Sequence, residues 1–263
     1  MSDNSGFPDK PSPARMYDYY LGGKHNFEID RQAAKQVIAF YPDMPYAAKS
    51  NRAFLRRVVP FLSSQGINQF LDLGSGIPTE GNVHEVAQSI NPQARTVYVE
   101  IDPVAVAYSQ QILEGQKNVA SVVGDVREPD TILNHSQTRS LIDFKQPVAV
   151  LMVAMLHFIT NDAELYRIVR AFRDAVPSGS YIVITHSCYF EGVKSDPTVD
   201  KVESIYAKAM EGLKIRTRDE VMPCFEGVEL VEPGFVDTVI WRPEEPQNNP
   251  KWSGYVAGVA RKS

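Results

Sequence analysis

The stretch QFLDLGSGIPTEGN, residues 69–82, decides the fold that this chain adopts. Its first five residues form an apolar run typical of a buried strand, and the glycines at 74 and 76 then favour a turn. A helical pattern begins at Asn82, which puts the unpaired N–H groups of a helix N-terminus near that turn. This order favours a ligand site, although an isolated G-x-G is equally typical of an ordinary strand-to-helix connection.

Further apolar runs follow this stretch, and helical patterns separate most of them. Strands that are joined through helices run parallel, so the pattern predicts an α/β fold with a parallel sheet. The last two runs leave no room for a helix between them and are expected to pair antiparallel. The expected strands are 69–73, 95–101, 118–123, 147–153, 180–186, 229–241 and 252–262. The expected helices are 82–89, 103–113, 162–176 and about 197–224, the last with a capping-box signature at Thr217 and Glu220.

The first 62 residues show no strand pattern. The N-terminal segment is polar and rich in proline, so burial cannot offset the entropy of ordering it, and we expect a disordered tail. Ser12 and Pro13 then begin a short aromatic helix, and Gly22 ends it. The expected units are a tail of residues 1–13, a helical cap region of residues 14–62 with helices over 14–21, 27–41 and 51–62, and a sheet domain of residues 63–263.

Composition and charge exclude several classes of protein. The chain has 263 residues, with 27 Lys and Arg against 32 Asp and Glu, and a net charge of −5. Its 43% hydrophobic residues suffice for a core, which excludes a disordered scaffold. Scattered cations on an acidic chain do not suit phosphate backbones or anionic lipids, so neither nucleic acid nor a membrane is an expected partner. No signal segment or bilayer-spanning run is present, and we expect a cytoplasmic protein.

Thiol and metal chemistry also find little support. Two cysteines, Cys188 and Cys224, are too few for a disulfide framework or a four-thiolate metal site, so we expect reduced, buried thiols. No His, Asp and Glu group shows tight ligand spacing, and no metal is expected.

Acidic side chains follow the second and third strands, at the end where an open parallel sheet binds ligands. Glu100 and Asp102 lie on one face because side chains alternate along a strand, and a carboxylate there can accept both hydroxyls of a ribose. Asp102 is also suited to cap the next helix, and Glu100 to meet a basic partner. Asp125 could accept from the amine of an adenine that packs against Val126, but taken singly it is more often a turn residue.

Two histidines follow the fourth and fifth strands. His157 comes shortly after Ala154 at the end of the fourth strand, and His186 ends the fifth. A lone histidine is more often structural than catalytic, but two at the carboxyl ends of adjacent strands would face the same crevice. His157 is our first candidate for an acid/base or acceptor-orienting role, and His186 is the second.

The conjunction of a glycine turn, acids that end two strands and a closing hairpin resembles the class I S-adenosylmethionine-dependent methyltransferases. The resemblance to the bacterial S-adenosyl methyltransferase family, whose substrate is undetermined, runs from about residue 11 to the C-terminus. It implies a Rossmann-like sheet of seven mostly parallel strands with an antiparallel C-terminal hairpin, and S-adenosylmethionine as cofactor. The segments that carry it are PSPARMYDYYLGGKHNF, NRAFLRRVVPFLSSQGINQFLDLGSGIPTEGNVHEVAQ, VYVEIDP, VAMLHFI, GSYIVITH and LVEPG.

The resemblance also implies residue roles. Asp72, Gly74 and Gly76 would surround the methionine part of the cofactor, Asp102 would bind the ribose, and Asp125 with Val126 would bind the adenine. The expected cofactor set further includes Ser75, Thr79, Asn82, Glu100, Gly124 and Ala154. One departure from the pattern D-x-G-x-G-x-G is Pro78, which fixes its own φ and removes a donor, so the loop must be longer before its helix begins.

Methyl transfer is an in-line displacement, so catalysis rests mainly on holding a small-molecule acceptor in line and excluding water. A sulfonium cation favours aromatic faces, and the aromatic helix over 14–21 is therefore expected to cover the crevice. The same helix could instead pack through Met16, Tyr20 and Leu21. The residues that we expect to face cofactor or acceptor are Arg15, Tyr17, Asp18 and Tyr20.

Two rival functions remain open. A nicotinamide-dependent oxidoreductase would need Gly or Ala where Thr79 stands and an acid about 20 residues after the first glycine, whereas Asp102 lies 28 residues after Gly74. Both mismatches count against it. A non-catalytic protein that binds the cofactor as a sensor or assembly surface would show the same crevice residues, and the sequence does not separate it from an enzyme.

Overall fold

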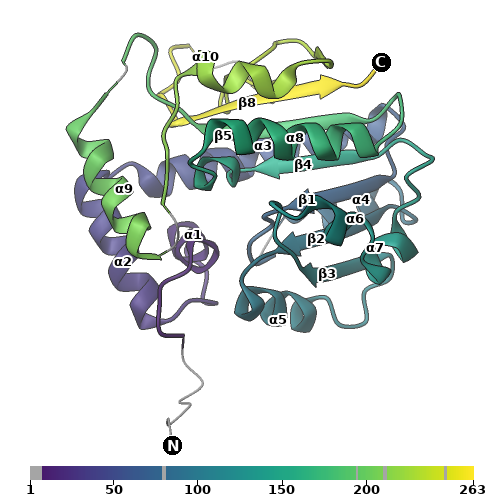
Figure 1. The fold of residues 1–263 in the computed structure, drawn as a ribbon, viewed down its shortest axis with the longest axis horizontal. Helices are drawn as coiled ribbons and strands as arrows, with labels where there is room; N and C mark the ends of the chain where they lie inside the picture. The colour runs from purple at the N-terminus through teal and green to yellow at the C-terminus, as the bar shows by residue number, and fades with distance from the viewer. Residues whose placement is uncertain (1–7, 79–80, 194, 210–211, 246–247) are drawn as a thin grey trace, which may run out of the picture.

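The computed structural model describes residues 8–78, 81–193, 195–209, 212–245 and 248–263. Its centre is one mixed sheet in the order β3-β2-β1-β4-β5-β8-β6, with β7 also paired to β8 (Figure 1). The first five strands run parallel, and β8 runs antiparallel to β5, β6 and β7. The strands are β1 Gln69–Leu73, β2 Arg95–Glu100, β3 Val119–Val123, β4 Ala149–Val153, β5 Tyr181–Ser187, β6 Glu229–Leu230, β7 Val236–Asp237 and β8 Tyr255–Arg261.

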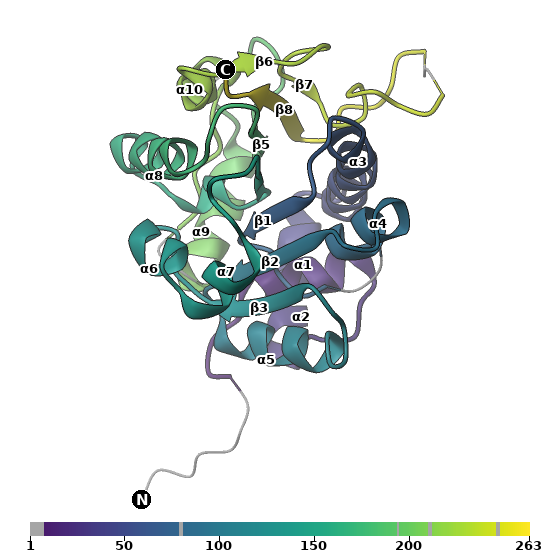
Figure 2. The same cartoon turned by 90° about the vertical axis from the view of Figure 1, so that its right-hand side faces the viewer.

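Helices cover both faces of this sheet, as Figure 2 shows. Apolar side chains of α3 and α4 pack on one face, and those of α6 and α8 pack on the other. Both faces are therefore buried, which is why the central strands are continuous apolar runs rather than alternating ones. The helices of the sheet layers are α3 Met44–Ser64, α4 Val83–Ile90, α5 Pro103–Ile112, α6 Pro129–Leu133, α7 Ser136–Leu141 and α8 Asp162–Ala175.

A separate apolar cluster holds the helical cap together. It combines α1 Pro13–Leu21, α2 Glu28–Phe40, the start of α3 and α9 Pro197–Ala209, which Figure 1 shows grouped beside the sheet. Met16, Val37 and Ala48 are fully buried in this cluster. A helix from the C-terminal half thus joins three from the N-terminus, so the cap region contains more than the N-terminal helices.

The predicted α/β fold is confirmed, and the five parallel strands lie within two residues of their expected limits. The prediction of one strand over residues 229–241 is wrong. The segment forms β6 and β7 instead, because Pro233 has no N–H donor and Gly234 takes a left-handed φ of 90° between them. Both short strands still pair antiparallel with β8, as the sequence predicts for this hairpin.

One helix prediction needs correction. The third helix begins at Met44 rather than at residue 51, because its first turns pack in the cap and its later turns pack on the sheet, so the apolar stripe changes face along the helix. The helical region expected over about 197–224 consists of α9, then α10 Arg218–Val221 and a 3-10 turn, η2 Met222–Phe225. The capping box that the sequence predicts at Thr217 and Glu220 begins α10.

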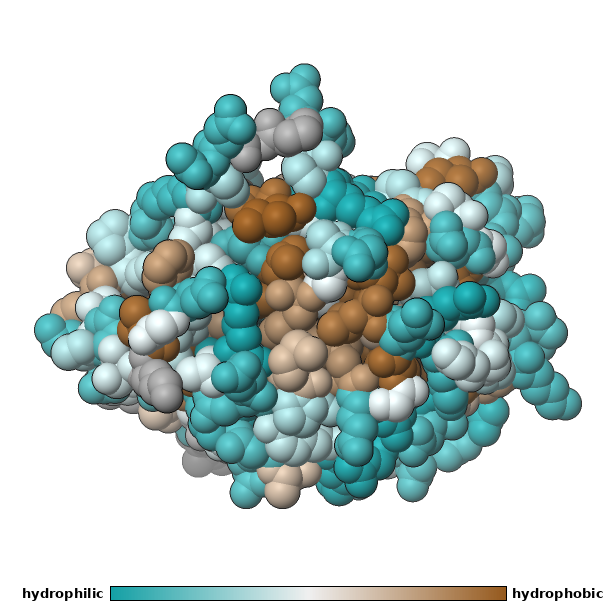
Figure 3. Space-filling model, turned by 90° about the horizontal axis from the view of Figure 1, so that it is seen from above, coloured by the Kyte–Doolittle hydropathy of each residue, from teal (hydrophilic) through white to brown (hydrophobic). Residues whose placement is uncertain are grey.

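One face of the surface and the two cysteines can be compared with the expectations from composition. Figure 3 looks down on the end that carries α10 and β8, and apolar side chains gather at the centre of this face among polar ones. Cys188 and Cys224 are buried and unpaired with each other, as expected. Among the described residues, no helix is both long enough and apolar enough to cross a membrane.

Candidate functional site

A crevice of about 650 Å³ lies between the carboxyl ends of the parallel strands and the cap. Its volume is within the range of small-molecule sites, about 300–1,000 Å³. The residues before α1, the glycine turn after β1, the ends of β2, β3 and β4, and the first part of α3 all contribute to its walls. Sites of parallel sheets form at this edge because the strand ends leave backbone groups unpaired there.

The backbone of the glycine turn after β1 lies close to neighbouring side chains. Gly74 has a left-handed φ of 66°, and a Cβ at this position would lie 2.6 Å from the Cβ of Met155. Gly76 has φ of 64°, with open space where a Cβ would stand, and its N–H donates to the Glu100 carboxylate over 3.0 Å. Ser75 lines the crevice between them. The turn therefore puts bare backbone, rather than side chains, against the space that a ligand would fill.

The loop that follows departs from the expected cofactor set. Thr79 lies outside the described residues. Asn82 is the N-cap of α4, forms a capping box with Glu85 and does not line the crevice. The helix begins only at Val83, which agrees with the longer loop expected from Pro78.

Two buried acids face the crevice beside the turn. Glu100, the last residue of β2, is only 6% exposed and accepts hydrogen bonds from the N–H groups of Gly76, Ile101 and Asp102. Burial raises its pKa, and these hydrogen bonds oppose the rise. Burial also raises the pKa of Asp72 to about 7, against the positive charge of Arg52 and with a contribution from Glu100. The crevice thus holds two carboxylates that are costly to ionise.

Asp102 has a different environment from Glu100. One carboxylate oxygen accepts the Val104 N–H over 2.9 Å and caps α5, as the sequence predicts. The other oxygen pairs with the guanidinium of Arg15 from the cap. Arg15 also donates to the buried Asp30 over 2.9 Å, so this arginine joins the two acids. The Asp102 side chain therefore ties the cap to the end of β2.

This contact orders part of the segment that we expected to be a disordered tail. Arg15 donates to the carbonyl of Lys10, and the N–H of Ser12 donates to Asp30. Residues 8–12 lie along the crevice as a result. Composition alone did not indicate this, because the partners that hold the segment come from α1 and α2.

The end of β3 supplies the expected adenine wall. Asp125 and Val126 both line the crevice, together with Gly124, whose missing side chain leaves room for Val99 and Ile132. Burial would raise the pKa of Asp125, but hydrogen bonds from Arg127 hold it below its ordinary value. Asp125 is therefore an ionised, partly exposed acceptor.

Tyr17 joins the cap to two strands through a chain of hydrogen bonds. Its hydroxyl donates to the Ala48 carbonyl and accepts from Asn51, and the Asn51 carbonyl accepts from Thr185 of β5. The Thr185 hydroxyl in turn accepts the N–H of Ala154, over 2.8 Å. Ala154 and Tyr17 both line the crevice. Burial raises the pKa of Tyr17, so its hydroxyl stays protonated and is suited to orienting rather than to taking a proton.

Asp18 and Tyr20 lie outside the crevice lining. The Asp18 carboxylate accepts from the N–H of His25 and from the side-chain amide of Asn26, and so holds the turn between α1 and α2. Tyr20 packs in the cap cluster, with its hydroxyl 3.1 Å from that of Tyr206. The packing face that the sequence offered as an alternative for α1 is therefore present, and of the four candidates on this helix Arg15 and Tyr17 line the crevice.

The two histidines have different environments. His157, in the 3-10 turn η1 Leu156–Phe158, lines the crevice, is only 3% exposed, and its Nδ1 has no hydrogen-bond partner among the described residues. Burial lowers its pKa well below the ordinary value, as do His186 and Arg216 nearby. His157 is therefore a neutral imidazole with an unsatisfied ring nitrogen.

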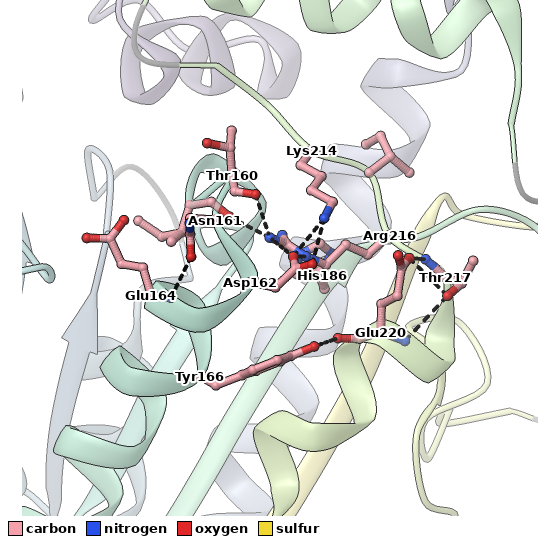
Figure 4. Close-up of polar contacts among 12 residues, drawn as sticks. Thr160, Asn161, Asp162, Glu164, Tyr166, His186, Lys214, Arg216, Thr217 and Glu220 are labelled. Atoms are coloured by element: carbon pink, nitrogen blue, oxygen red, sulfur yellow. Dashed lines mark hydrogen bonds and ion pairs between the residues drawn. The ribbon is translucent and has the colours of Figure 1, made fainter.

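His186 does not line the crevice. Its ring lies 3.1 Å from the Arg216 guanidinium, which is itself held by Asp162 at 2.8 Å (Figure 4). Burial and this positive charge lower the pKa of His186 to about 3. The side chain is neutral and belongs to a buried structural network.

Several crevice residues carry no signal in the sequence. Arg52 of α3 lines the crevice, and within the described residues it has no hydrogen bond or ion pair of its own. Ile101, an apolar side chain that is 45% exposed, lines it beside the end of β2. The apolar pattern of α3 shows which of its residues are buried. It does not show that the polar Arg52, on another face of the helix, lies beside Asp72 of β1, 20 residues later. No group of three metal-ligand side chains occurs in the described part of the chain.

Comparison with known proteins identifies the family. The family model described as S-adenosyl methyltransferase matches residues 7–263, so the chain belongs to the S-adenosyl methyltransferase family. The cofactor of that family is S-adenosylmethionine, in agreement with the expectation from the sequence. No curated protein matches the chain.

Solved structures agree with this result. A "putative methyltransferase" from Thermobifida fusca YX is 43% identical, with a TM-score of 0.90 over 96% of this chain and 95% of that one. A DUF574 family protein from Streptomyces avermitilis MA-4680 is 34% identical, with a TM-score of 0.89 over 97% and 98%. A mitomycin 7-O-methyltransferase is 14% identical, with a TM-score of 0.53 over 98% and 74%, and this likeness concerns the fold alone. The fold is that of the class I methyltransferases, as predicted.

Proposed function

We propose that this S-adenosyl methyltransferase is an active enzyme that methylates a small-molecule acceptor held beneath the helical cap. The observation that carries the proposal is the set of groups in the crevice. A bare glycine turn, two buried acids and Arg52, whose positive charge acts on Asp72, meet at one edge of the sheet. Buried ionisable groups are costly unless they meet a partner of opposite charge, and each of these features matches a group of S-adenosylmethionine.

Glu100 is our choice for the ribose hydroxyls. Its carboxylate lies at the end of β2 beside Gly76 and, within the described residues, accepts hydrogen bonds from backbone N–H groups only. Asp102, which the resemblance implied for this role, caps α5 through one oxygen and pairs with the guanidinium of Arg15 through the other. A carboxylate that pairs with a buried guanidinium is less available to a ribose, so we assign Asp102 to closing the cap.

The adenine and the methionine part would lie on either side of this acid. Asp125 is ionised and pairs with Arg127, and because both side chains are partly exposed its carboxylate can also accept the adenine amine. Val126 and the exposed Ile101 offer apolar surface to the ring. Asp72 suits the cofactor's ammonium group, and Arg52 suits its carboxylate. A cofactor with a net positive charge therefore meets an excess of acids.

When bound, S-adenosylmethionine supplies a methyl group on a sulfonium. The chain then has to orient the acceptor and exclude water. Tyr17 covers the crevice with a ring that the Asn51 hydrogen bond holds in place, and Arg15 keeps the cap closed on β2. His157 is neutral and lines the crevice, so it is suited to orient the acceptor or to receive its proton. We assign Asp18, Tyr20 and His186 to structure.

The experiment is calorimetric titration of the full chain with S-adenosylmethionine, S-adenosylhomocysteine and NAD. We expect both adenosyl compounds to bind and NAD not to bind, with Glu100→Gln weakening binding by about tenfold or more and Asp102→Asn by less. Tight binding of NAD alone would overturn the assignment. Binding without methyl transfer to any acceptor in a broad panel would favour a sensor.

A further inference from the structure

A second cavity, of about 380 Å³, adjoins the crevice. Four residues line both spaces, and they come from α3, η1, α9 and β8. The shared wall consists of Met44, His157, Tyr206 and Tyr255. A molecule in the second cavity would therefore lie next to a cofactor in the crevice where the two spaces meet at these side chains.

The lining of the second cavity is almost free of charge. Aromatic and aliphatic side chains dominate it, including Tyr189, Trp252 and Ile215. The one ionisable acid among the described lining residues is Asp196, whose carboxylate is engaged in a turn at the start of α9 with the Thr198 N–H at 2.7 Å. No Lys or Arg lines the cavity within the described part of the chain. An anionic ligand would lose its hydration here without gaining a counter-ion, and the one carboxylate is engaged in a turn, so the lining favours a neutral ligand.

Aromatic rings surround both the mouth and the shared wall of this cavity. Phe190, 58% exposed, lines it and packs edge-to-face on Trp252 at 5.6 Å. At the wall, Tyr255 lies 5.9 Å from His157 between ring centroids. Aromatic rings favour edge-to-face and offset contacts with other rings, so this lining suits a flat, ring-containing ligand.

His157 adds one polar group to this apolar space. It lines both cavities, is nine-tenths or more buried, and keeps Nδ1 without a partner among the described residues. A buried, unsatisfied ring nitrogen is costly unless a ligand bonds to it. A neutral imidazole can accept a hydrogen bond from a hydroxyl, whereas an amine of ordinary basicity would arrive charged.

We propose that the second cavity binds the methyl acceptor, and that the acceptor is an uncharged aromatic molecule whose hydroxyl bonds to His157 at the shared wall. This inference rests on the proposed function. The hydroxyl oxygen forms the new bond to the methyl carbon, and the carbon–sulfur bond breaks with its electron pair on sulfur. The oxygen's proton passes to the ring nitrogen of His157. A weak base suffices, because an oxygen that has gained a methyl group before losing its proton is strongly acidic.

The test uses calorimetry on full-length protein loaded with S-adenosylhomocysteine. The probes are 2-naphthol, its anionic analogue 2-naphthoate and the hydroxyl-free 2-methylnaphthalene. We expect 2-naphthol to bind tightest, because it alone is both neutral and able to donate to His157. This comparison needs no variant. Equal or tighter binding of 2-naphthoate, or no binding of 2-naphthol, would overturn the proposal.

Three variants locate the probe. Val199→Trp, a half-buried position that lines only the second cavity, should weaken 2-naphthol binding by about tenfold or more. Val86→Trp, a half-buried valine of α4 that lines neither cavity, should leave it unchanged. His157→Phe should weaken 2-naphthol by about two- to tenfold and leave 2-methylnaphthalene unchanged. Equal effects of the two tryptophans would refute the location.

The outcome of this test is separable from that of the proposed function. S-adenosylhomocysteine should bind Val199→Trp as it binds the wild type, because Val199 is outside the crevice lining. If S-adenosylhomocysteine binds and 2-naphthol does not, the acceptor assignment fails and the cofactor assignment stands. If S-adenosylhomocysteine itself does not bind, the proposed function fails.

Discussion

Asp72→Asn is the substitution that most directly tests the electrostatics of the crevice. Asp72 is only 6% exposed, and its pKa is raised from 3.8 to about 7. In the unfolded chain the carboxyl ionises near its ordinary pKa, so the folded state holds the extra proton between these two values. Stability contributed by this group therefore falls as pH rises from 3.8 to 7, and stays low above 7.

The magnitude follows from the shift. About three pKa units at 1.36 kcal/mol each make the ionised carboxylate cost about 4 kcal/mol of folding free energy above pH 7. Asparagine has nearly the same shape and does not ionise. The difference in unfolding free energy, variant minus wild type, should therefore grow by about 3 kcal/mol between pH 5 and pH 8.

Urea unfolding at pH 5, 6, 7 and 8 measures this difference, since other titrating groups cancel between the two proteins. The same variant should bind S-adenosylmethionine about ten- to a hundredfold more weakly, because it loses the partner of the ammonium group. Asp174→Asn, on the exposed surface of α8, removes the same charge outside the crevice and should leave the affinity unchanged. A difference that is constant with pH would refute the reasoning.

Three further predictions concern the cap, the buried histidine and the glycine turn. Arg15→Met leaves Asp30 buried without its ion pair, and urea unfolding should show a loss of about 3–5 kcal/mol; unchanged stability would contradict the proposed link. The pKa of His186 lies near 3 when folded, so stability is lost as pH falls below 6.5, and His186→Gln should reduce that slope by about 1.4 kcal/mol per pH unit. Gly74→Ala should lower the melting temperature more than Gly66→Ala, which has a similar φ but open space at its Cβ; equal losses would exclude the Met155 contact as the cause.

Much of the fold could be predicted because each buried parallel strand appears in the sequence as a short, continuous apolar run. The run QFLDL is β1 residue for residue, and the capping role of Asp102 followed from Pro103 beside it. These are local signals. The break between β6 and β7 was missed because each strand is only two residues long and depends on β8 for its pairing.

The site was harder to predict because its contacts join distant segments. Arg15 and Asp102 are 87 positions apart, and nothing near either residue indicates the other. His186 shows the effect of strand periodicity. Its neighbour Thr185 bonds to Asn51 and to Ala154 beside the crevice, so His186 points to the opposite side of β5, toward Arg216. The sequence placed His186 at the correct strand end but did not settle its face.

The charges in the crevice also bear on turnover. Asp72 and Glu100 are two buried acids, and Arg52 is the cation whose charge acts on Asp72. S-adenosylmethionine carries a sulfonium, an ammonium and a carboxylate, whereas S-adenosylhomocysteine has lost the sulfonium charge. Under the proposed function, methyl transfer therefore removes one positive charge from among acids that are costly to ionise. The product then compensates these acids less well than the cofactor does, and this difference favours replacement of the product by a new cofactor.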